Sequence, residues 1–254
     1  MFVCIRNCND CQSYLTYLSQ CAITMKRFFL ILFVSIHAIL LAEDNTENTL
    51  TDIDGNRYRT VKIGHQLWMA ENLKVTHYND GTEIPEITSS QGWEFTKNGA
   101  YCYLNNNPKN NDRSGKLYNW FAVETGKLAP KGWHVPTVSE VNQLIEYLGK
   151  ETAGVQMKAS PKSWYQKDKS LATNTSGFCA IPGGFRNEFM AFDFPNFTAI
   201  FWTSDVYVDQ PEDVGVFARH GKYAWSYNVF YAFTHVSVND YQKICGYSVR
   251  CIKD

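Results

Sequence analysis

The strongest structural signal in this chain is a helix that begins at Thr137 and ends before Gly149. Thr137 and Glu140 have the spacing of a capping box, in which the two residues satisfy each other's backbone amides at the start of a helix. Apolar side chains then recur every three or four residues, at Val138, Val141, Leu144, Ile145 and Leu148. The sequence therefore predicts an amphipathic helix with one buried face.

Before this helix, the pattern predicts hairpins, loops and one shorter helix. Turn residues at 54–56 and 64–65 separate the runs Arg57–Ile63 and Gln66–Met69, which we interpret as short hairpin strands. Polar, turn-rich stretches at 78–96 and 105–115 predict surface loops. Helical spacing recurs between Lys116 and Glu124, which predicts the shorter helix.

After residue 175 no helical stripe recurs, and short aromatic runs alternate with Gly, Asn and Asp. These runs predict strands at Phe178–Ile181, Ile200–Thr203, Val214–Ala218 and Ser248–Ile252. The order of elements is therefore strands, two helices and then irregular β-structure, which is an α+β fold class.

The composition fits a globular protein and argues against a nucleic-acid partner. Hydrophobic residues make up 44% of the chain and charged residues 19%, which is enough apolar material for a sizeable core. The 24 Lys and Arg residues nearly cancel the 25 Asp and Glu residues, so no basic surface for phosphates is indicated. Aromatic residues reach 15%, which suits both β-rich cores and stacking surfaces.

The start of the chain has the pattern of an export signal. Residues 28–41 are apolar apart from Ser35 and His37, and they follow the basic pair Lys26-Arg27. This run is too short for a typical membrane span, so we interpret residues 25–42 as a signal peptide that ends at a small residue, Ala42. An uncleaved anchor is the alternative. Residues 1–24 then precede the true start at Met25, residues 43–51 form a linker, and residues 52–254 form one exported domain with no membrane span after cleavage.

Four cysteines lie in the exported part of the chain. An even number of cysteines in an exported protein predicts two disulfides, with three connectivities. If residues 247–252 form a strand, Cys245 and Cys251 lie up to ~20 Å apart, beyond the ~7 Å reach of a disulfide. We predict a bridge between Cys102 and Cys251, with Cys179 and Cys245 either paired or free.

Several segments resemble, in order, those of a family of exported bacterial proteins, the Fibrobacter succinogenes major paralogous domain. The segments span nearly all of the exported chain: 52–56, 63–74 (IGHQLWMAENLK), 99–103, 117–123 (LYNWFAV), 132–137 (GWHVPT), 180–186 (AIPGGFR), 201–204 and 246–254. Segment 132–140 and the closing strand also resemble formylglycine-generating enzymes. This resemblance implies a C-type-lectin-like domain with two helices and irregular antiparallel sheets. Ala129 departs from the cysteine expected of many members.

The sequence gives no support for catalysis. Formylglycine-generating enzymes use a close cysteine pair to bind copper, but Cys251 matches their separate structural cysteine, which leaves Cys245 alone. The chain contains no His-Glu-x-x-His, Gly-x-Ser-x-Gly or phosphate-binding loop, and its histidines share no ligand spacing. We therefore expect a protein that is not an enzyme and that needs no cofactor, with calcium as the one ion to test.

The calcium hypothesis comes from two motifs of sugar-binding C-type lectins. Gln210-Pro211-Glu212-Asp213 and Asn239-Asp240 resemble their calcium loop and the following strand. Carboxylate and amide oxygens are the ligands that calcium prefers, so Glu212, Asp213, Asn239 and Asp240 are the candidate metal ligands. Both dipeptides, Gln-Pro and Asn-Asp, also occur in ordinary turns, and Val238 replaces the tryptophan usual before Asn-Asp.

Aromatic stacking is the second route to sugar binding. In the run 223–231, alternate residues share one face of an extended chain, so Trp225 and Tyr227 could form a platform for sugar rings. The alternative is that these rings belong to the core face of a sheet. We expect an exported binding module for polysaccharide or a surface protein. The alternatives are a structural or adhesive surface protein without a small-ligand site and a cryptic enzyme of the formylglycine-generating type.

Overall fold

The described part of the chain begins with a three-stranded meander. The computed structural model describes residues 49–165, 171–209 and 221–254, within one compact unit, Asn48–Asp254. Strands β1 (Thr49–Thr51), β2 (Arg57–Ile63) and β3 (Gln66–Met69) pair antiparallel. Their turns contain Gly55 and Gly64, both with positive φ, so the sequence-based hairpins are confirmed. Strand β1 lies within the predicted linker 43–51, whose boundary was therefore wrong.

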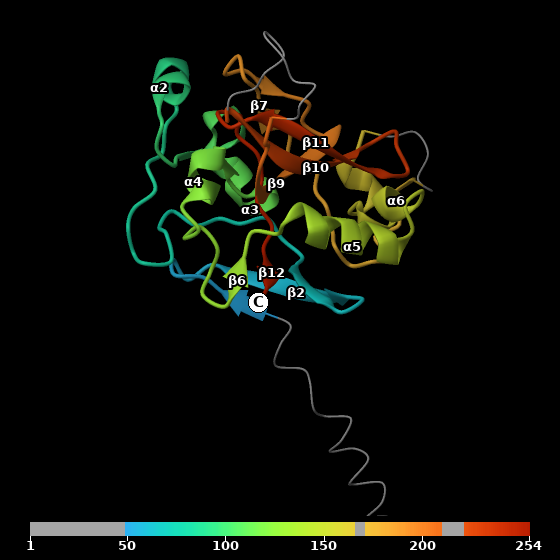
Figure 1. Cartoon of the computed structure of the whole chain (residues 1–254). Helices are drawn as coiled ribbons and strands as arrows, with labels where there is room; N and C mark the ends of the chain where they lie inside the picture. Colours follow the sequence, from blue (N-terminus) through green and yellow to red (C-terminus); the bar gives the residue numbers. More distant parts are fainter. Residues whose placement is uncertain (1–48, 166–170, 210–220) are drawn as a thin grey trace, which may run out of the picture. The chain divides into compact units, whose positions relative to one another are not determined.

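The chain returns to this sheet at its other end. Strand β12 (Ile252–Lys253) lies between β3 and β6 (Trp133–His134), which gives the strand order β1-β2-β3-β12-β6. In Figure 1 these strands lie together, with the first and last described strands in one layer. The sheet therefore closes the domain by joining residues far apart in the sequence.

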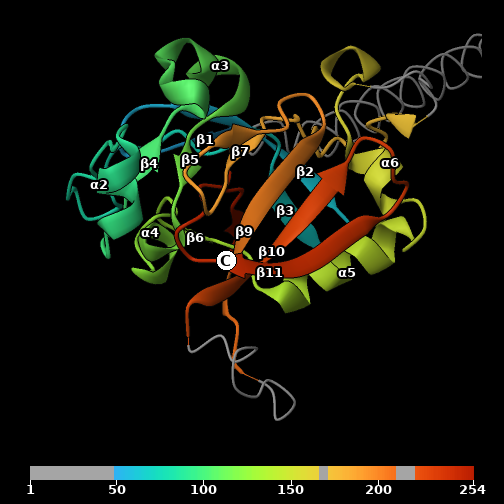
Figure 2. The same cartoon turned by 90° about the horizontal axis from the view of Figure 1, so that it is seen from above.

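A second sheet is built from three longer strands. Strands β9 (Thr198–Val206), β10 (Tyr223–Phe230) and β11 (Val236–Gln242) are antiparallel in the order β11-β10-β9. Figure 2 shows the three strands side by side. The predicted strand Ile200–Thr203 lies within β9, whereas Val214–Ala218 lies outside the described residues. Phe178–Ile181 contributes only a bridge at Ala180.

Helix α5 (Val138–Leu148) connects the two sheets. The capping box of Thr137 and Glu140 is present, and Gly149 forms the C-cap, so the helix has the predicted bounds. Four of its stripe residues, from Val141 to Leu148, belong to a core cluster that also contains Trp68 of β3 and Phe201 of β9, whereas Val138 is half-buried. The predicted amphipathic face is therefore covered by both sheets.

The described residues contain more helix than the sequence predicts. Four further α-helices are short, namely α2 (Ser90–Phe95), α3 (Asn111–Ser114), α4 (Trp120–Glu124) and α6 (Ala153–Met157). Helix α4 corresponds to the predicted second helix, shortened because the Asn119 side chain caps its start. Helices α2 and α3 lie in stretches predicted as loops. Since α2 buries a single side chain, Trp93, its sequence has no periodic apolar stripe from which a helix could be predicted.

The remaining described elements are small. Strands β4 (Tyr101–Cys102) and β5 (Leu117–Tyr118) pair with each other, as do β7 (Phe185–Arg186) and β8 (Phe192–Asp193). Single 3₁₀ turns cover Leu104–Asn106, Pro108–Asn110 and Pro161–Ser163. No helix within the described ranges is long and apolar enough to cross a membrane.

The C-terminal segment does not form the predicted continuous strand 247–252. Tyr247 pairs with Tyr118 and Ser248 pairs with Phe201 as isolated bridges, and regular strand pairing begins only at Ile252. The segment crosses the core and meets a different element at each step. The alternation predicted a strand with one buried face, whereas every residue from 245 to 252 is buried, because the segment is covered by several elements rather than by one sheet.

The predicted disulfide between Cys102 and Cys251 is not formed, and all four described cysteines are free thiols. Cys102 lies in a small cluster with Trp93 and Leu117, whereas Cys251 lies in the large cluster around Trp202. Burial raises the pKa of the Cys102 and Cys245 thiols to about 12, so both stay protonated at neutral pH. These cysteines pack as small apolar side chains.

Candidate binding surface

The sugar platform predicted from Trp225 and Tyr227 is wrong, because the two rings have different environments. Tyr227 is fully buried, and its ring stacks on Phe201 with centroids 5.0 Å apart. Trp225 is half-buried and packs against Tyr207 at 5.6 Å. The pairing of β10 with β9 shifts register between Ala224 and Ser226, next to Trp225. Tyr227 is therefore a core residue and offers no face to a ligand.

The calcium hypothesis stays a prediction. Glu212 and Asp213 lie outside the described residues, while Asn239 and Asp240 are neighbours on β11. Asn239 pairs with Ser226 and Asp240 with Trp225 across the sheet. No group of three or more His, Cys, Asp or Glu side chains in the described ranges is placed to hold a metal ion.

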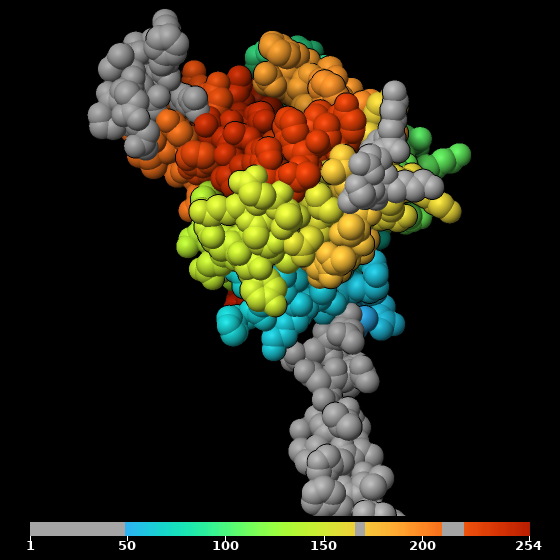
Figure 3. Space-filling model, turned by 90° about the vertical axis from the view of Figure 1, so that its right-hand side faces the viewer, coloured from blue at the N-terminus to red at the C-terminus, as the bar shows by residue number. Residues whose placement is uncertain are grey.

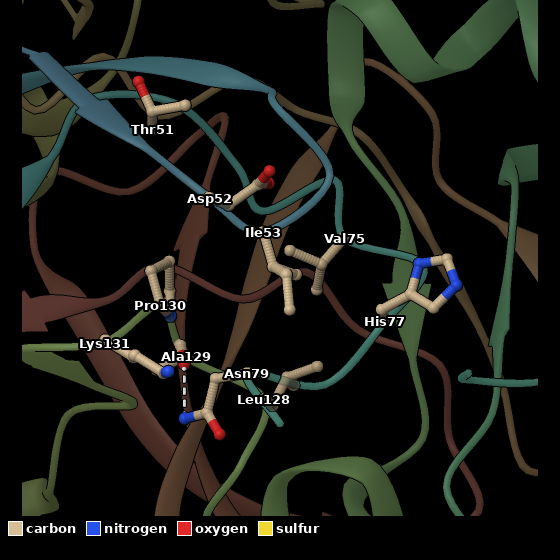
Figure 4. Close-up of a pocket in the computed structure, with 10 residues that line it drawn as sticks. All are labelled: Thr51, Asp52, Ile53, Val75, His77, Asn79, Leu128, Ala129, Pro130 and Lys131. Atoms are coloured by element: carbon tan, nitrogen blue, oxygen red, sulfur yellow. Dashed lines mark hydrogen bonds between the residues drawn. The ribbon is translucent and has the colours of Figure 1, made fainter. Parts of the chain in front are cut away.

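A hollow of about 250 Å³ lies between the β1–β2 turn and the segments around residues 75–79 and 128–131. Figure 4 shows Ile53 in its centre, directed toward Val75 and Leu128. Asn79 donates a hydrogen bond of 3.0 Å to the carbonyl of Ala129, so its amide is already engaged. The centre of the hollow is therefore apolar.

His77 lies at the edge of this hollow and pairs with Asp54. Its Nδ1 lies 2.5 Å from Oδ1 of Asp54, whose other oxygen accepts from the backbone amide of Thr76. Burial acts to raise the pKa of Asp54, but the hydrogen bonds from Thr76 and His77 outweigh it and lower the pKa. In Figure 4 the far side of the imidazole points away from Ile53 and Leu128. The pair therefore holds the turn in place, and His77 lines only the edge of the hollow.

A larger feature is a surface strip of six aromatic rings, which we call the aromatic strip. Three of its rings are exposed, Tyr165 by 55%, Phe194 by 54% and Phe233 by 46%, and the others are half-buried. Phe230 is the last residue of β10, and the other five rings come from three connections: the chain after Pro161–Ser163, the β8–β9 connection and the β10–β11 connection. The strip consists of Tyr165, Phe194, Phe197, Phe230, Tyr231 and Phe233.

The rings of the strip contact one another in an unbroken series. Phe197 is central, with centroids 6.2 Å from Phe194, 4.5 Å from Tyr165 and 5.2 Å from Tyr231. From Tyr231 the series continues to Phe230 at 4.8 Å, and from Phe230 to Phe233 at 5.1 Å. Edge-to-face and offset contacts of this kind fix ring orientation beyond simple burial. The strip is therefore one ordered surface.

The backbone holds the β8–β9 connection in an unusual conformation. Phe194 has φ of 53° and Asn196 has φ of 70°, a region that bulky side chains rarely adopt. The amide of Asn196 donates to the carbonyl of Pro182, and its carbonyl accepts from the amide of Tyr165 at 2.7 Å. Such a conformation costs about 1–3 kcal/mol and persists only where the surroundings impose it, which is common at functional sites. Here it turns the Phe194 ring outward.

A buried lysine supports the β10–β11 connection from below. The ammonium group of Lys158 donates to the carbonyl oxygens of Tyr231 at 3.0 Å and Phe233 at 2.7 Å. It also lies 5.7 Å from the ring centroid of Trp164. No carboxylate within the described residues pairs with it. Burial lowers the pKa of Lys158 from 10.5 to about 8, so the charge is kept at some cost to stability.

Helix α6 approaches the same connection at Gly154. A Cβ atom at this position would lie 2.5 Å from the carbonyl oxygen of His235 and 2.7 Å from that of Thr234. The amide of Val155 donates to the Thr234 carbonyl at 3.1 Å. Only glycine permits this contact, so α6 and Lys158 together fix the loop that carries Tyr231 and Phe233.

Sequence reasoning missed the aromatic strip because its members come from distant segments. Phe230 and Tyr231 stand in the run that predicted the platform, but that run also contains buried Tyr227. Phe194 and Tyr165 lie about 30 residues apart and more than 30 residues from Phe233. A signal was present in the Phe-Asp-Phe-Pro-Asn-Phe run at 192–197, where aromatic residues alternate with turn residues.

Comparison with known proteins gives one finding. A sequence profile of the Fibrobacter succinogenes major domain matches residues 61–253. The match covers α5, the three-stranded sheet and every ring of the aromatic strip. No curated protein and no solved structure matches the chain.

Proposed function

The chain belongs to the Fibrobacter succinogenes major domain family, and on that premise we propose that it is an exported, non-catalytic module that binds polysaccharide through the aromatic strip. The apolar run at residues 28–41 supports export. The proposal includes a C-type-lectin-like fold, which the antiparallel sheets and the helices α4 and α5 support.

The observation that carries this proposal is the exposed, ordered series of rings. Sugar rings have apolar C–H faces that stack on aromatic rings, and a series of rings can contact successive units of a chain. Phe194 and Phe233 extend the strip on either side of Phe197. Exposed aromatic patches of this kind are uncommon in soluble domains unless they bind something.

The edges of the strip offer hydrogen bonds for hydroxyl groups. Asn196, Thr234 and His235 are exposed beside the rings, and Arg113 donates to the Asn196 side chain at 3.0 Å. Polar groups around a central apolar surface are typical of binding sites in general. Rings and amides also need no metal, so the proposal stands with or without calcium at Glu212, Asp213, Asn239 and Asp240.

The test measures binding to a panel of soluble polysaccharides, namely β-glucan, xylan, galactomannan and polygalacturonate. Phe233→Ala and Phe194→Ala each remove one exposed ring, and we expect each to weaken binding about tenfold, which is 1.4 kcal/mol. Phe189→Ala is the matched control, because Phe189 is 82% exposed and lies outside the strip. Affinity electrophoresis, run with excess calcium and with chelator, measures the polysaccharide affinity of the unaltered protein and of each variant.

Absence of binding by the unaltered protein to every polysaccharide of the panel would overturn the proposal. So would equal affinities for Phe233→Ala and the unaltered protein. If the strip instead mediates adhesion to a protein surface, the ring variants lose that adhesion while the sugar panel stays blank. Loss of binding only in chelator would move the site from the strip to the calcium ligands.

A further inference from the structure

The aromatic strip continues beyond Phe233 into a cleft. The imidazole of His235 stacks on the Phe233 ring, with centroids 5.1 Å apart and planes at 11°. His235 also lines a hollow of about 620 Å³ between α5 and β11, which we call the α5–β11 cleft. The α5–α6 segment lies beside the β10–β11 segment on the face shown in Figure 3. One side chain is therefore shared by the strip and the cleft.

The cleft has the composition of a sugar subsite. Ile145 of α5 and Val236 and Val238 of β11 give it an apolar floor. Asn142 and His235 stand at its walls with exposed amide and imidazole groups. Ligand sites have volumes of about 300–1,000 Å³ with an apolar lining and a few polar groups, so the cleft has room for sugar units.

The charges of the cleft restrict the kind of sugar. Glu146 and Glu151 lie in its lining with one cation, Lys150. Lys150 already pairs with Glu146, with Nζ and Oε1 2.8 Å apart. Within the described residues no cation pairs with Glu151, so the cleft has a net negative charge. A polymer of uronic acids would bring like charges together, which costs binding free energy.

We propose that the α5–β11 cleft is a second sugar subsite, and that the ligand of this protein is a neutral polysaccharide bound along the strip and into the cleft. This inference rests on the proposed function, since it extends the same surface. The route runs from Phe194 through Phe197 and Phe233 to His235, and from there over Ile145 and Val238. The strip recognises the faces of the sugar rings, and the cleft discriminates by charge and length.

Filling the cleft tests the subsite. Asn142→Trp places a large ring at its wall. Asn142 also lines a neighbouring hollow, so the control is Gln143→Trp on the same helix, which lines that hollow but not the cleft. Affinities are measured for oligosaccharides of increasing length prepared from β-glucan, xylan and galactomannan. We expect Asn142→Trp to lose about tenfold in affinity for the longest members only. Short members, which the strip alone can hold, keep their affinity.

Charge is tested separately with Glu151→Lys. This variant should raise affinity for polygalacturonate about tenfold at low salt, and the gain should shrink as salt increases. Affinity for the neutral polymers should stay within about twofold. Glu151→Gln only removes the repulsion between Glu151 and polygalacturonate, whereas Glu151→Lys also adds an attraction, so comparing the affinities of the two variants separates these effects.

Four outcomes decide the matter. Equal loss of affinity in Asn142→Trp and Gln143→Trp, or no loss in either, would overturn the subsite while Phe233→Ala still supports the strip. Binding of polygalacturonate by the unaltered protein as tightly as neutral polymers would overturn the charge argument. A change of oligomeric state in Asn142→Trp would instead make the cleft an interface between two copies. Failure of Phe233→Ala as well would sink the proposed function itself.

Discussion

Two groups of aromatic rings in this protein have opposite roles. In the core, Trp202 and Tyr247 lie 4.4 Å apart, and both are buried. Trp202 lies on strand β9 and Tyr247 on the C-terminal segment. The Trp202 indole N–H donates a hydrogen bond of 2.8 Å to the Tyr118 carbonyl. In the aromatic strip, by contrast, five of the six rings stand on connecting segments and Phe230 ends β10, and Phe194 is more than half exposed.

The difference shows that ring contacts alone do not distinguish a core from a binding surface. Both groups have centroid spacings in the range typical of aromatic pairs. The two groups of rings differ in the backbone that positions them. The core rings follow from strand pairing, whereas the strip depends on the strained Phe194 and on Lys158, neither of which improves stability by itself.

The largest expected effect is on the core. Trp202→Ala should lower the free energy of unfolding by about 3–5 kcal/mol, because it leaves a cavity and removes the contact with Tyr247. Phe233→Ala should lower it by about 1 kcal/mol or less, since that ring is 46% exposed. Urea unfolding of the two variants checks this. Equal losses of stability would break the comparison and place Phe233 in the core.

Lys158→Met tests whether the buried lysine below the aromatic strip serves binding rather than stability. The variant removes a charge that is costly to bury, so the free energy of unfolding should change by about 1 kcal/mol or less. The carbonyls of Tyr231 and Phe233 lose their donor, so polysaccharide binding should weaken about tenfold. Lys162→Met, at an exposed lysine in the neighbouring turn, is the control. A large loss of stability with normal binding would contradict the supporting role.

The pH dependence of the unaltered protein tests the same contact. Because the folded pKa of Lys158, about 8, is below the unfolded value of 10.5, the unfolded chain holds more protons between these values. The contribution of this group to stability therefore rises as pH increases from 8 to 10.5. Binding should fall over that range as the ammonium charge is lost. The Lys158→Met variant should show neither trend.

The smallest expected effect comes from His134, which fastens the sheet that carries no strip residue. Its ring nitrogens lie 2.7 Å from Asp254 and 2.9 Å from Glu140. Burial acts to lower the pKa of His134, but the hydrogen bonds to Asp254 and Glu140 outweigh it and raise the pKa. Its stabilisation is therefore complete below 6.5 and is lost as pH rises through the raised pKa. The effect is small because the imidazole is 38% exposed.

Melting curves from pH 5 to 8 for the unaltered protein and for His134→Gln check this effect. The difference between their midpoints should shrink as pH rises, and the two proteins should bind polysaccharide equally at each pH. A constant difference would show that His134 acts through packing alone. A change in binding would mean that the sheet held by His134 influences the aromatic strip.

Local sequence patterns predicted the elements that depend on neighbouring residues. The capping box at Thr137 and the stripe ending at Leu148 gave α5 its bounds, because both are set within a few turns of one helix. The turns at Gly55 and Gly64 likewise gave the hairpins. The short helices α2 and α3 were not predicted, since a helix that buries one side chain has no periodic apolar pattern in its sequence.

The same reasoning failed where a residue's role depends on distant segments. The bridge between Cys102 and Cys251 was predicted from the even cysteine count and an assumed strand at 247–252, but the two residues pack in different clusters. Tyr227 and Trp225 share one periodicity, yet only the neighbouring strand β9 determines that Tyr227 meets Phe201. Alternation in a strand tells which residues share a face and not whether that face is covered.

The sequence by itself determined the α+β class, the helix α5, the hairpins and the family. These follow from interactions between residues a few positions apart, or from ordered segments that can be compared directly. Only the tertiary structure decided which aromatic rings are exposed and which are core. Tyr165, Phe197 and Phe233 come together because three connections converge over Lys158 and Gly154. Contacts between distant loops depend on how the sheets and α6 pack, and no local pattern encodes that packing.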